Sequence, residues 1–180
     1  GDGRLYIREL ALGSFRQDRA PLAFWLVSRL YDLLSNAEHA YRVMSTLSGI
    51  GFCVIVRALV SRLTPSGPLR CSLTLLVLVQ GYVLIFFGYA ENYGLLFVMS
   101  AAHLYVSLLA LDRTIGLWCP ALVLAMTICT HLAAACLAPS LILLAYLRRP
   151  MRIRDAAGLA IAPVGTFLIL LLLDFDIHKL

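Results

Sequence analysis

Apolar residues occur along this chain in long blocks that short polar breaks separate. Blocks of roughly 17 to 25 apolar residues have the length that a helix needs to cross the hydrocarbon of a bilayer. The pattern predicts four such crossings, over residues 40–60, 71–87, 95–111 and 156–173. The stretch 117–147 is too long for one untilted crossing, so we expect two short helices that meet at a bend near His131 and Pro139.

The first 35 residues have a different, amphipathic pattern, in which leucine, tyrosine and tryptophan mix with arginine and acidic residues. Such segments tend to lie in the membrane interface rather than to cross it. We expect two interfacial helices here, the second beginning at Pro21, because proline suits the first turn of a helix. The segment Ser35-Asn36-Ala37-Glu38 has the form of a capping box and predicts the start of the first crossing.

The predicted fold is therefore all-α, a polytopic bundle of transmembrane helices that forms a single membrane domain over residues 1–180. Residues 1–35 form an outer interfacial loop with two helices, and residues 37–175 hold about six membrane helices, two of them short. The chain opens on Gly1-Asp2-Gly3 and ends just past an apolar block, so we expect it to be a fragment with neighbouring segments on both sides.

The composition also indicates that the chain lies in a bilayer and not in water. Of the 180 residues 61% are hydrophobic and 14% are charged, and the mean hydropathy is +0.88. A soluble domain carries about a quarter charged residues. The 5 cysteines form no CxxC pair, and we interpret them as small apolar residues. The sequence holds no Walker loop, GxGxxG, GxSxG or HExxH motif, which disfavours ATP-driven transport, dinucleotide chemistry and the common hydrolases.

The formal charge of +5 comes from arginines that fall mostly between the apolar blocks. Basic loops between membrane helices stay in the cytoplasm, so we expect these arginines to set orientation and not to bind nucleic acid. Arg57, Arg62 and Arg70 mark one cytoplasmic loop, and the run from Arg148 to Arg154 marks another. Alternating crossings then place residues 1–35, residues 88–94, the bend at 131–139 and the tail after 173 on the outer side.

This topology gathers the polar side chains that lack an evident structural duty on one face of the membrane, where they could line one cavity. They are Asp2, Asp18, Glu91, Asn92, Tyr93, His131, Asp174 and Asp176. The guanidinium-rich turns lie on the opposite face.

Three acidic residues in this set each have two interpretations. Glu91 contacts a sugar or phosphate group, or else belongs to a hydrated turn. Asp2 acts as a general base or holds a divalent cation, or else Gly-Asp-Gly is an ordinary turn. Asp18 contributes to a site, or else caps the helix that follows.

The remaining polar groups favour structural roles by local chemistry alone. A lone histidine in an apolar region more often bonds a neighbouring carbonyl than performs catalysis, which applies to His131 and more strongly to His103. Gln80 receives the same interpretation. Asp174-Phe175-Asp176 has the DxD form that holds a metal with a nucleotide sugar, but nucleotide sugars are cytoplasmic and this tail is predicted outside.

Several segments resemble the GT-C superfamily of polytopic glycosyltransferases, in particular the bacterial relatives of dolichyl-phosphate-mannose–protein mannosyltransferases. Gly1-Asp2-Gly3 is similar to the acidic opening of their outer loop. Arg19-Ala-Pro-Leu-Ala-Phe-Trp25 is similar to the entry of their second interfacial helix, and Ala37-Glu-His-Ala-Tyr-Arg42 to the start of the next crossing. The turn 88–93 and the short helices around His131 also resemble that group.

The resemblance implies transfer of a sugar from a polyprenyl-phosphate donor at the outer face of the cytoplasmic membrane. Asp2 would be the catalytic carboxylate, acting directly or through a divalent cation, although Gly3 stands where relatives often carry a second acid. The residues expected to bind substrate are Asp18, Arg19, Glu91, Asn92, Tyr93 and His131. The alternatives are a transporter or permease subunit, in which Glu91, His103 and His131 form a path through the bundle, and a non-catalytic membrane fragment.

Overall fold

The computed structural model describes residues 3–12, 19–81, 86, 92–150 and 153–173. Every regular element among these residues is a helix, as the apolar pattern predicts. In chain order the helices are α1 (Gly3–Ala11), α2 (Pro21–Leu34), α3 (Ala37–Leu63), α4 (Gly67–Leu78), α5 (Tyr93–Leu111), α6 (Trp118–Thr130), the 3-10 helix η2 (Leu132–Leu137), α7 (Ala138–Leu147), α8 (Ile153–Leu159) and α9 (Ile161–Leu172).

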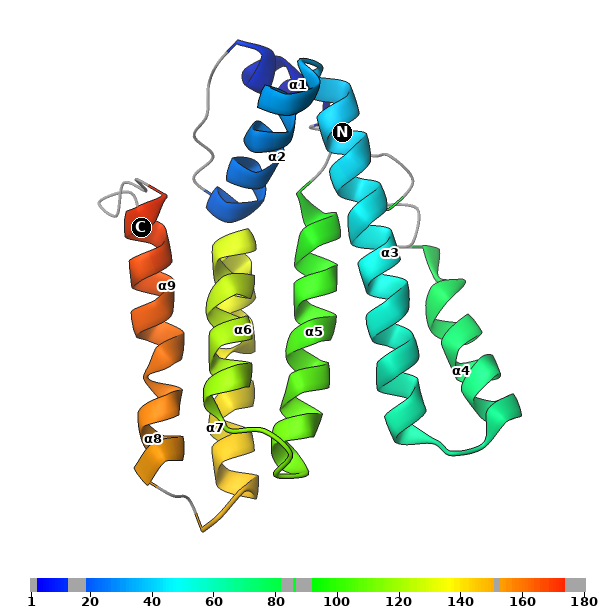
Figure 1. Cartoon of the computed structure of the whole chain (residues 1–180), viewed down its shortest axis with the longest axis vertical. Coiled ribbons are helices and arrows are strands. Elements are labelled where there is room, and N and C mark those ends of the chain that lie inside the picture. The colour runs from blue at the N-terminus through cyan, green and yellow to red at the C-terminus, as the bar shows by residue number, and fades with distance from the viewer. Residues whose placement is uncertain (1–2, 13–18, 82–85, 87–91, 151–152, 174–180) are drawn as a thin grey trace.

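The helices α3, α5, α6 and α9 lie side by side with their axes roughly parallel, and α1 and α2 lie together across one end of this row (Figure 1). Helix α6 is the centre of the bundle, because it contacts α2, α5, α7, α8 and α9. Leu117 and Leu124, at the start and middle of α6, have no exposed surface. The bundle is therefore organised around one short helix and not around its longest one.

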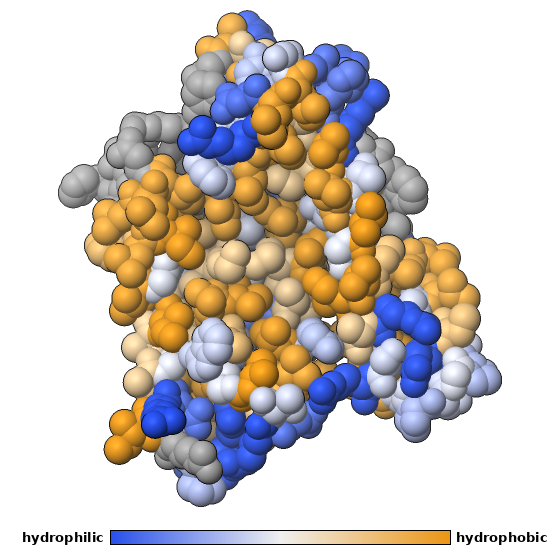
Figure 2. Space-filling model, in the orientation of Figure 1, coloured by the Kyte–Doolittle hydropathy of each residue, from blue (hydrophilic) through white to orange (hydrophobic). Residues whose placement is uncertain are grey.

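Three helical segments, Ala37–Leu63, Tyr93–Leu111 and Ile153–Leu172, are long and apolar enough to cross a membrane. Three further apolar helical segments of the described chain are shorter: Gly67–Leu78, Trp118–Thr130 and Leu132–Leu147. Figure 2 shows hydrophobic side chains over the middle of the visible face and hydrophilic ones towards its two ends. We predicted two short helices among six, and the structure has three.

The additional short helix is α4, and the predicted crossing over residues 71–87 is wrong at both ends. Helix α4 already begins at Gly67, because Pro68 fits the first helical turn instead of breaking it. It ends at Leu78, where the side-chain amide of Gln80 donates to the Leu76 carbonyl (2.9 Å) and Gly81 follows. Twelve residues rise only about 18 Å, less than the roughly 30 Å of a bilayer core.

Two boundaries of the other crossings also differ from prediction. The cap of α3 is Asn36 and not Ser35: the Asn36 side chain accepts from the His39 amide (3.0 Å), while Ser35 ends α2 in a left-handed conformation with φ 51°. The predicted crossing over 156–173 is two helices, α8 and α9, which meet at Ala160. Proline has no amide hydrogen to donate back along a helix, so Pro163 accounts for the interruption.

The other predicted elements are confirmed. Two helices precede the first crossing, and Pro21 is at the start of the second. The stretch 117–147 is divided at His131 into α6 and the η2–α7 segment, and Pro139 lies in the first turn of α7. The chain reverses at this division. One end of the bundle therefore carries α2, the junction of α6 with η2, the amino end of α5 and the carboxyl end of α9 (Figure 1).

Close approach of α6 to α8 and α9 depends on small side chains. A Cβ atom added at Gly158 would lie 2.9 Å from the backbone nitrogen of Trp118, and one at Gly165 would lie 3.4 Å from the Ala125 Cβ. Small residues at helix contacts let backbones approach, and dispersion contacts then hold the pair.

Replacing Gly158 by leucine should therefore force α8 away from the start of α6. We expect Gly158→Leu to lower the free energy of unfolding by about 1–3 kcal/mol, the usual cost of overpacking. Ala157→Leu is the matched control, because Ala157 is exposed on the same helix. Thermal unfolding of both variants in detergent, followed by circular dichroism, measures the difference, and equal midpoints would contradict the close packing.

Candidate functional site

The structure describes four of the seven residues predicted to form the site: Arg19, Asn92, Tyr93 and His131. Asp2, Asp18 and Glu91 lie outside the described residues, and so do Asp174 and Asp176 of the DxD segment. The four described residues come from three parts of the sequence. Arg19 precedes α2, Asn92 and Tyr93 begin α5, and His131 follows α6.

His131 lies at the point where the apolar stretch 117–147 reverses direction. Its backbone is extended (φ −162°, ψ 121°), and its amide donates to the Thr127 carbonyl at 3.2 Å. Its side-chain Nδ1 accepts from the Ala133 amide at 3.2 Å and so caps η2. Because Nδ1 accepts, the neutral ring carries its proton on Nε2, which makes Nε2–H a hydrogen-bond donor.

Tyr93 stacks on His131. The two ring centroids are 5.2 Å apart and the ring planes differ by 25°. Tyr93 is the first residue of α5 and its side chain is exposed, whereas His131 is partly buried. The pair therefore presents an aromatic surface at this end of the bundle, formed by residues 38 positions apart in the sequence.

Arg19 is connected to the same junction through its backbone, because its carbonyl accepts from the Leu132 amide at 2.9 Å. Its side chain is exposed. Burial lowers the pKa of His131 below its ordinary value, and the positive charge of Arg19 lowers it further. His131 is therefore uncharged at neutral pH, and Arg19 supplies the positive charge.

The structure thus brings Arg19, Tyr93 and His131 together, and we call these three residues the outer cluster. Asn92 precedes Tyr93 in sequence, but its side chain is buried, so it is not part of the exposed surface of the outer cluster. Chemically, the outer cluster offers an N–H donor, a guanidinium and an aromatic face. Such groups suit an anionic ligand that carries a ring, such as a sugar phosphate.

Metal binding receives no support from the described part of the chain, where no group of three or more histidine, cysteine, aspartate or glutamate side chains lies close enough to hold an ion. The expected cation at Asp2 falls on a residue outside that part. A divalent cation therefore stays a prediction from the resemblance alone.

Arginines from three separate turns lie together at the opposite end of the bundle. Arg62, at the end of α3, forms an ion pair of 2.6 Å with Asp112, at the end of α5. The guanidinium of Arg113 donates to the Arg148 carbonyl at 3.2 Å, and Arg148 pairs with Asp155 at 3.4 Å. The basic turns therefore share one end of the molecule, and the outer cluster occupies the other, as the predicted topology requires.

His103 has the structural role that its sequence context favours. It is buried in the middle of α5, where one ring nitrogen bonds the Pro120 carbonyl (3.1 Å) and the other bonds the Ser140 hydroxyl (2.8 Å). These two bonds tie α5 to α6 and α7. Both ring nitrogens are therefore occupied by structural partners.

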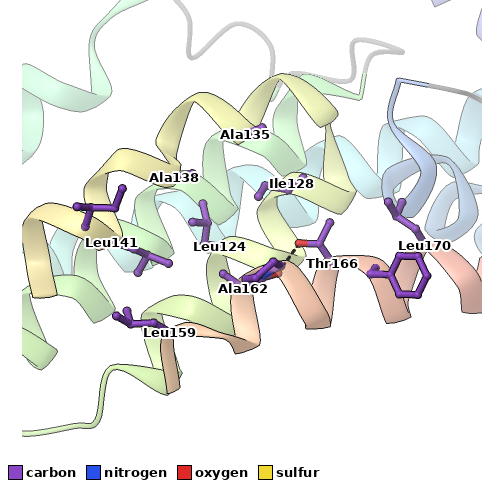
Figure 3. A pocket seen from close by; sticks show the side chains of 12 residues that line it. Leu124, Ile128, Ala135, Ala138, Leu141, Leu159, Ala162, Thr166 and Leu170 are labelled. Carbon is purple, nitrogen blue, oxygen red and sulfur yellow. Dashed lines mark hydrogen bonds between the residues drawn. The ribbon is translucent and has the colours of Figure 1, made fainter. Parts of the chain in front are cut away.

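An apolar groove between α6, α7 and α9 is a feature that sequence reasoning missed. It has a volume of about 550 Å³, and Leu124, Ile128, Leu141, Ala162 and Leu170 are among the residues that line it (Figure 3). The lining side chains are the ordinary residues of an apolar helix, so the sequence contains no signal for the groove. Only the reversal at His131, which sets α7 beside α6 and near α9, creates the groove.

No family model, no curated protein and no solved structure matches this chain.

The lowered pKa of His131 predicts a pH-dependent stability. The unfolded chain binds a proton on this histidine more readily than the folded chain does, so the free energy of unfolding falls as pH drops through the ordinary histidine range, and the loss levels off below the folded pKa. Between about pH 8 and pH 5, the unfolding temperature in detergent should fall further for the natural protein than for His131→Asn. Asparagine keeps an acceptor for the Ala133 amide but does not titrate. Parallel pH profiles of the two proteins would contradict the burial of His131.

Proposed function

We propose that this chain belongs to a multi-pass protein of the cytoplasmic membrane that transfers a sugar from a polyprenyl-phosphate donor to an acceptor at the outer face. The membrane part of the proposal rests on three helices long and apolar enough to span a bilayer. The catalytic part rests on the resemblance of the sequence to the GT-C superfamily and on the chemistry of the outer cluster.

One observation carries the proposal: Arg19, Tyr93 and His131, predicted from sequence as substrate-binding residues, converge at one end of the bundle, opposite the arginine-rich turns. Short loops rich in lysine and arginine remain in the cytoplasm. The end that carries Arg62, Arg113 and Arg148 therefore faces the cytoplasm, and the outer cluster faces outward, where a lipid-linked donor and an extracytoplasmic acceptor can meet.

Each group has a defined task in the proposed reaction. Asp2 is the general base that removes the proton from the acceptor hydroxyl. The Nε2–H of His131 and the guanidinium of Arg19 bind the phosphate of the donor and stabilise the charge that develops on it as the sugar leaves. The exposed ring of Tyr93 packs against the sugar. Asp18 and Glu91 complete the set of residues assigned to substrate binding, whereas the buried side chain of Asn92 has no part in it.

Orientation is tested by labelling native cysteines. Cys136, in η2, belongs to the same end as His131, and Cys71, in α4, is near the arginine-rich end; both are exposed. In single-cysteine variants within intact cells, a thiol reagent that cannot permeate the membrane should label Cys136 and not Cys71. Labelling of Cys71 alone would reverse the topology and remove the outward-facing site.

Sugar transfer is tested with the full-length protein in membrane vesicles that contain a polyprenyl-phosphate sugar. Asp2→Asn should abolish transfer, because the amide cannot act as a base. His131→Asn should lower kcat/KM about 10²-fold, the usual effect of removing one charge-stabilising donor. His39→Asn is the matched control, because His39 is exposed in the first turn of α3 and has no assigned task. Full transfer by both the Asp2 and the His131 variants would contradict the proposal.

The alternative from another class is a transporter, which requires polar groups through the depth of the bundle. His103 is the described histidine at that depth, and its hydrogen bonds to Pro120 and Ser140 give it a structural task. The glycosyltransferase therefore stays the preferred proposal. Substrate uptake into the same vesicles that is lost in both His103→Leu and His131→Asn, without sugar transfer by the natural protein, would favour transport instead.

A further inference from the structure

The apolar groove of about 550 Å³ between α6, α7 and α9 has the size of a ligand site, but its chemistry excludes a polar ligand. The lining side chains are hydrocarbon except for Thr166. The Thr166 hydroxyl donates to the Ala162 carbonyl at 2.7 Å, as the dashed line in Figure 3 shows, so it needs no other partner. The occupant that fits this lining is a hydrocarbon chain.

The groove is bordered by exposed side chains of the helices themselves. Ile142 of α7 is 73% exposed and Phe167 of α9 is 51% exposed, and both line the groove. In a membrane-embedded bundle, such residues contact lipid. A hydrocarbon chain can therefore enter from the side, without passing through the outer cluster.

A line of three residues connects the groove to the arginine-rich end. Ile142 and Tyr146 are four residues apart and share one side of α7, and Arg149 follows the carboxyl end of the helix and lies over Tyr146. Tyr146 is 61% exposed, and the Arg149 guanidinium lies over its ring at 4.9 Å from the centroid. The order of these groups therefore matches the order of the parts of a phospholipid. The apolar groove corresponds to the hydrocarbon chains, Tyr146 to the glycerol region and Arg149 to the phosphate.

The positive charge at this end exceeds what the neighbouring carboxylates neutralise. Arg148 is paired with Asp155, and Arg62 is paired with Asp112. Arg113 donates to the carbonyls of Arg148 and Arg149, at 3.2 and 3.4 Å. Within the described ranges, no carboxylate forms an ion pair with Arg113 or Arg149, so two guanidinium groups are available to an anion beside the groove.

We propose that this surface binds an anionic phospholipid of the cytoplasmic leaflet, with one hydrocarbon chain in the groove beside Ile142 and the phosphate at Arg149 and Arg113. Basic surfaces next to membrane helices on the cytoplasmic side attract anionic headgroups. The site rests on the membrane embedding and orientation proposed above, but not on sugar transfer. Its two arginines lie at the opposite end of the bundle from the outer cluster.

The test uses tryptophan fluorescence and phospholipids with brominated chains, which quench tryptophan on contact. In a protein whose own tryptophans, Trp25 and Trp118, are replaced by phenylalanine, one reporter is Ile142→Trp, at the groove. The matched reporter is Leu143→Trp, the next residue on α7, which is 57% exposed but does not line the groove. Both proteins are reconstituted in vesicles of phosphatidylcholine with increasing brominated phosphatidylglycerol, or with brominated phosphatidylcholine.

At position 142 we expect half-maximal quenching at about a thirtyfold lower mole fraction of the anionic lipid than of the zwitterionic one, since each of the two arginines provides about fivefold. At position 143 the two lipids should quench alike. Arg149→Gln should reduce the preference at 142 to about fivefold, the share of Arg113, whereas Arg29→Gln should keep it in full. Arg29 is the control, because it also lies over an aromatic ring, that of Trp25 at 5.3 Å, on α2 at the other end, and the Trp25→Phe replacement keeps a ring there. Unlike Arg149, it is paired with a carboxylate, that of Asp32 at 3.5 Å.

Three outcomes would overturn the proposal. Equal quenching by both lipids at position 142 would mean that the groove does not select an anionic headgroup. Quenching at 143 but not at 142 would mean that protein, from another segment or a second copy, covers the groove. Displacement of the brominated lipid by added polyprenyl phosphate, in a variant that lacks Arg149, would assign the groove to the sugar donor instead. Loss of sugar transfer alone would leave the lipid site intact, so the two proposals fail separately.

Discussion

The interruption of the apolar stretch 117–147 at His131 is the constraint on which the rest of the structure depends. A helix that ends inside an apolar bundle leaves backbone groups that need partners. Here the His131 ring accepts from the Ala133 amide, and the Arg19 carbonyl accepts from the Leu132 amide. Because these bonds satisfy the break, the chain can reverse, and α7 returns beside α6.

The two candidate sites are both consequences of that reversal. It holds the His131 ring where Tyr93 can stack on it, and thereby forms the outer cluster. It also places the η2–α7 segment so that α6, α7 and α9 enclose the apolar groove. The outer cluster lies at the turn of this short hairpin and the groove runs along its side, and the hairpin is tied to α5 by the hydrogen bonds of His103 to Pro120 and Ser140.

Charge divides the molecule in a way that agrees with this arrangement. At the arginine-rich end, Arg62 and Arg148 are each paired with a carboxylate from another element, so these pairs fasten the turns to one another. At the other end, burial lowers the pKa of His131 and the positive charge of Arg19 lowers it further, so the ring is neutral. An uncharged ring with a fixed tautomer is suited to donate a hydrogen bond to an anion, which is the task that the proposed reaction assigns to it.

Sequence alone determined the features that depend on local chemistry. Long apolar blocks predicted α3 and α5, which are long and apolar enough to span a bilayer, because the span of a helix depends only on residue count and polarity. Pro21 predicted the start of α2, and His131 and Pro139 predicted the bend, since both proline and an isolated polar ring disfavour an uninterrupted apolar helix. Where local signals competed, as at Ser35 and Asn36 or at Pro68 and Gly81, local chemistry could not rank them, and the predicted boundaries were wrong.

Only the tertiary structure decided which of these residues meet. The stacking of Tyr93 on His131, the partners of His103 and the apolar groove each join helices far apart in the chain, and no periodicity within one helix encodes the position of another. The sequence also does not show which arginines are neutralised, because Arg62 pairs with the carboxylate of Asp112, 50 residues away. These contacts depend on helix packing. Small residues such as Gly158 permit close packing, but they do not indicate in the sequence which helices meet.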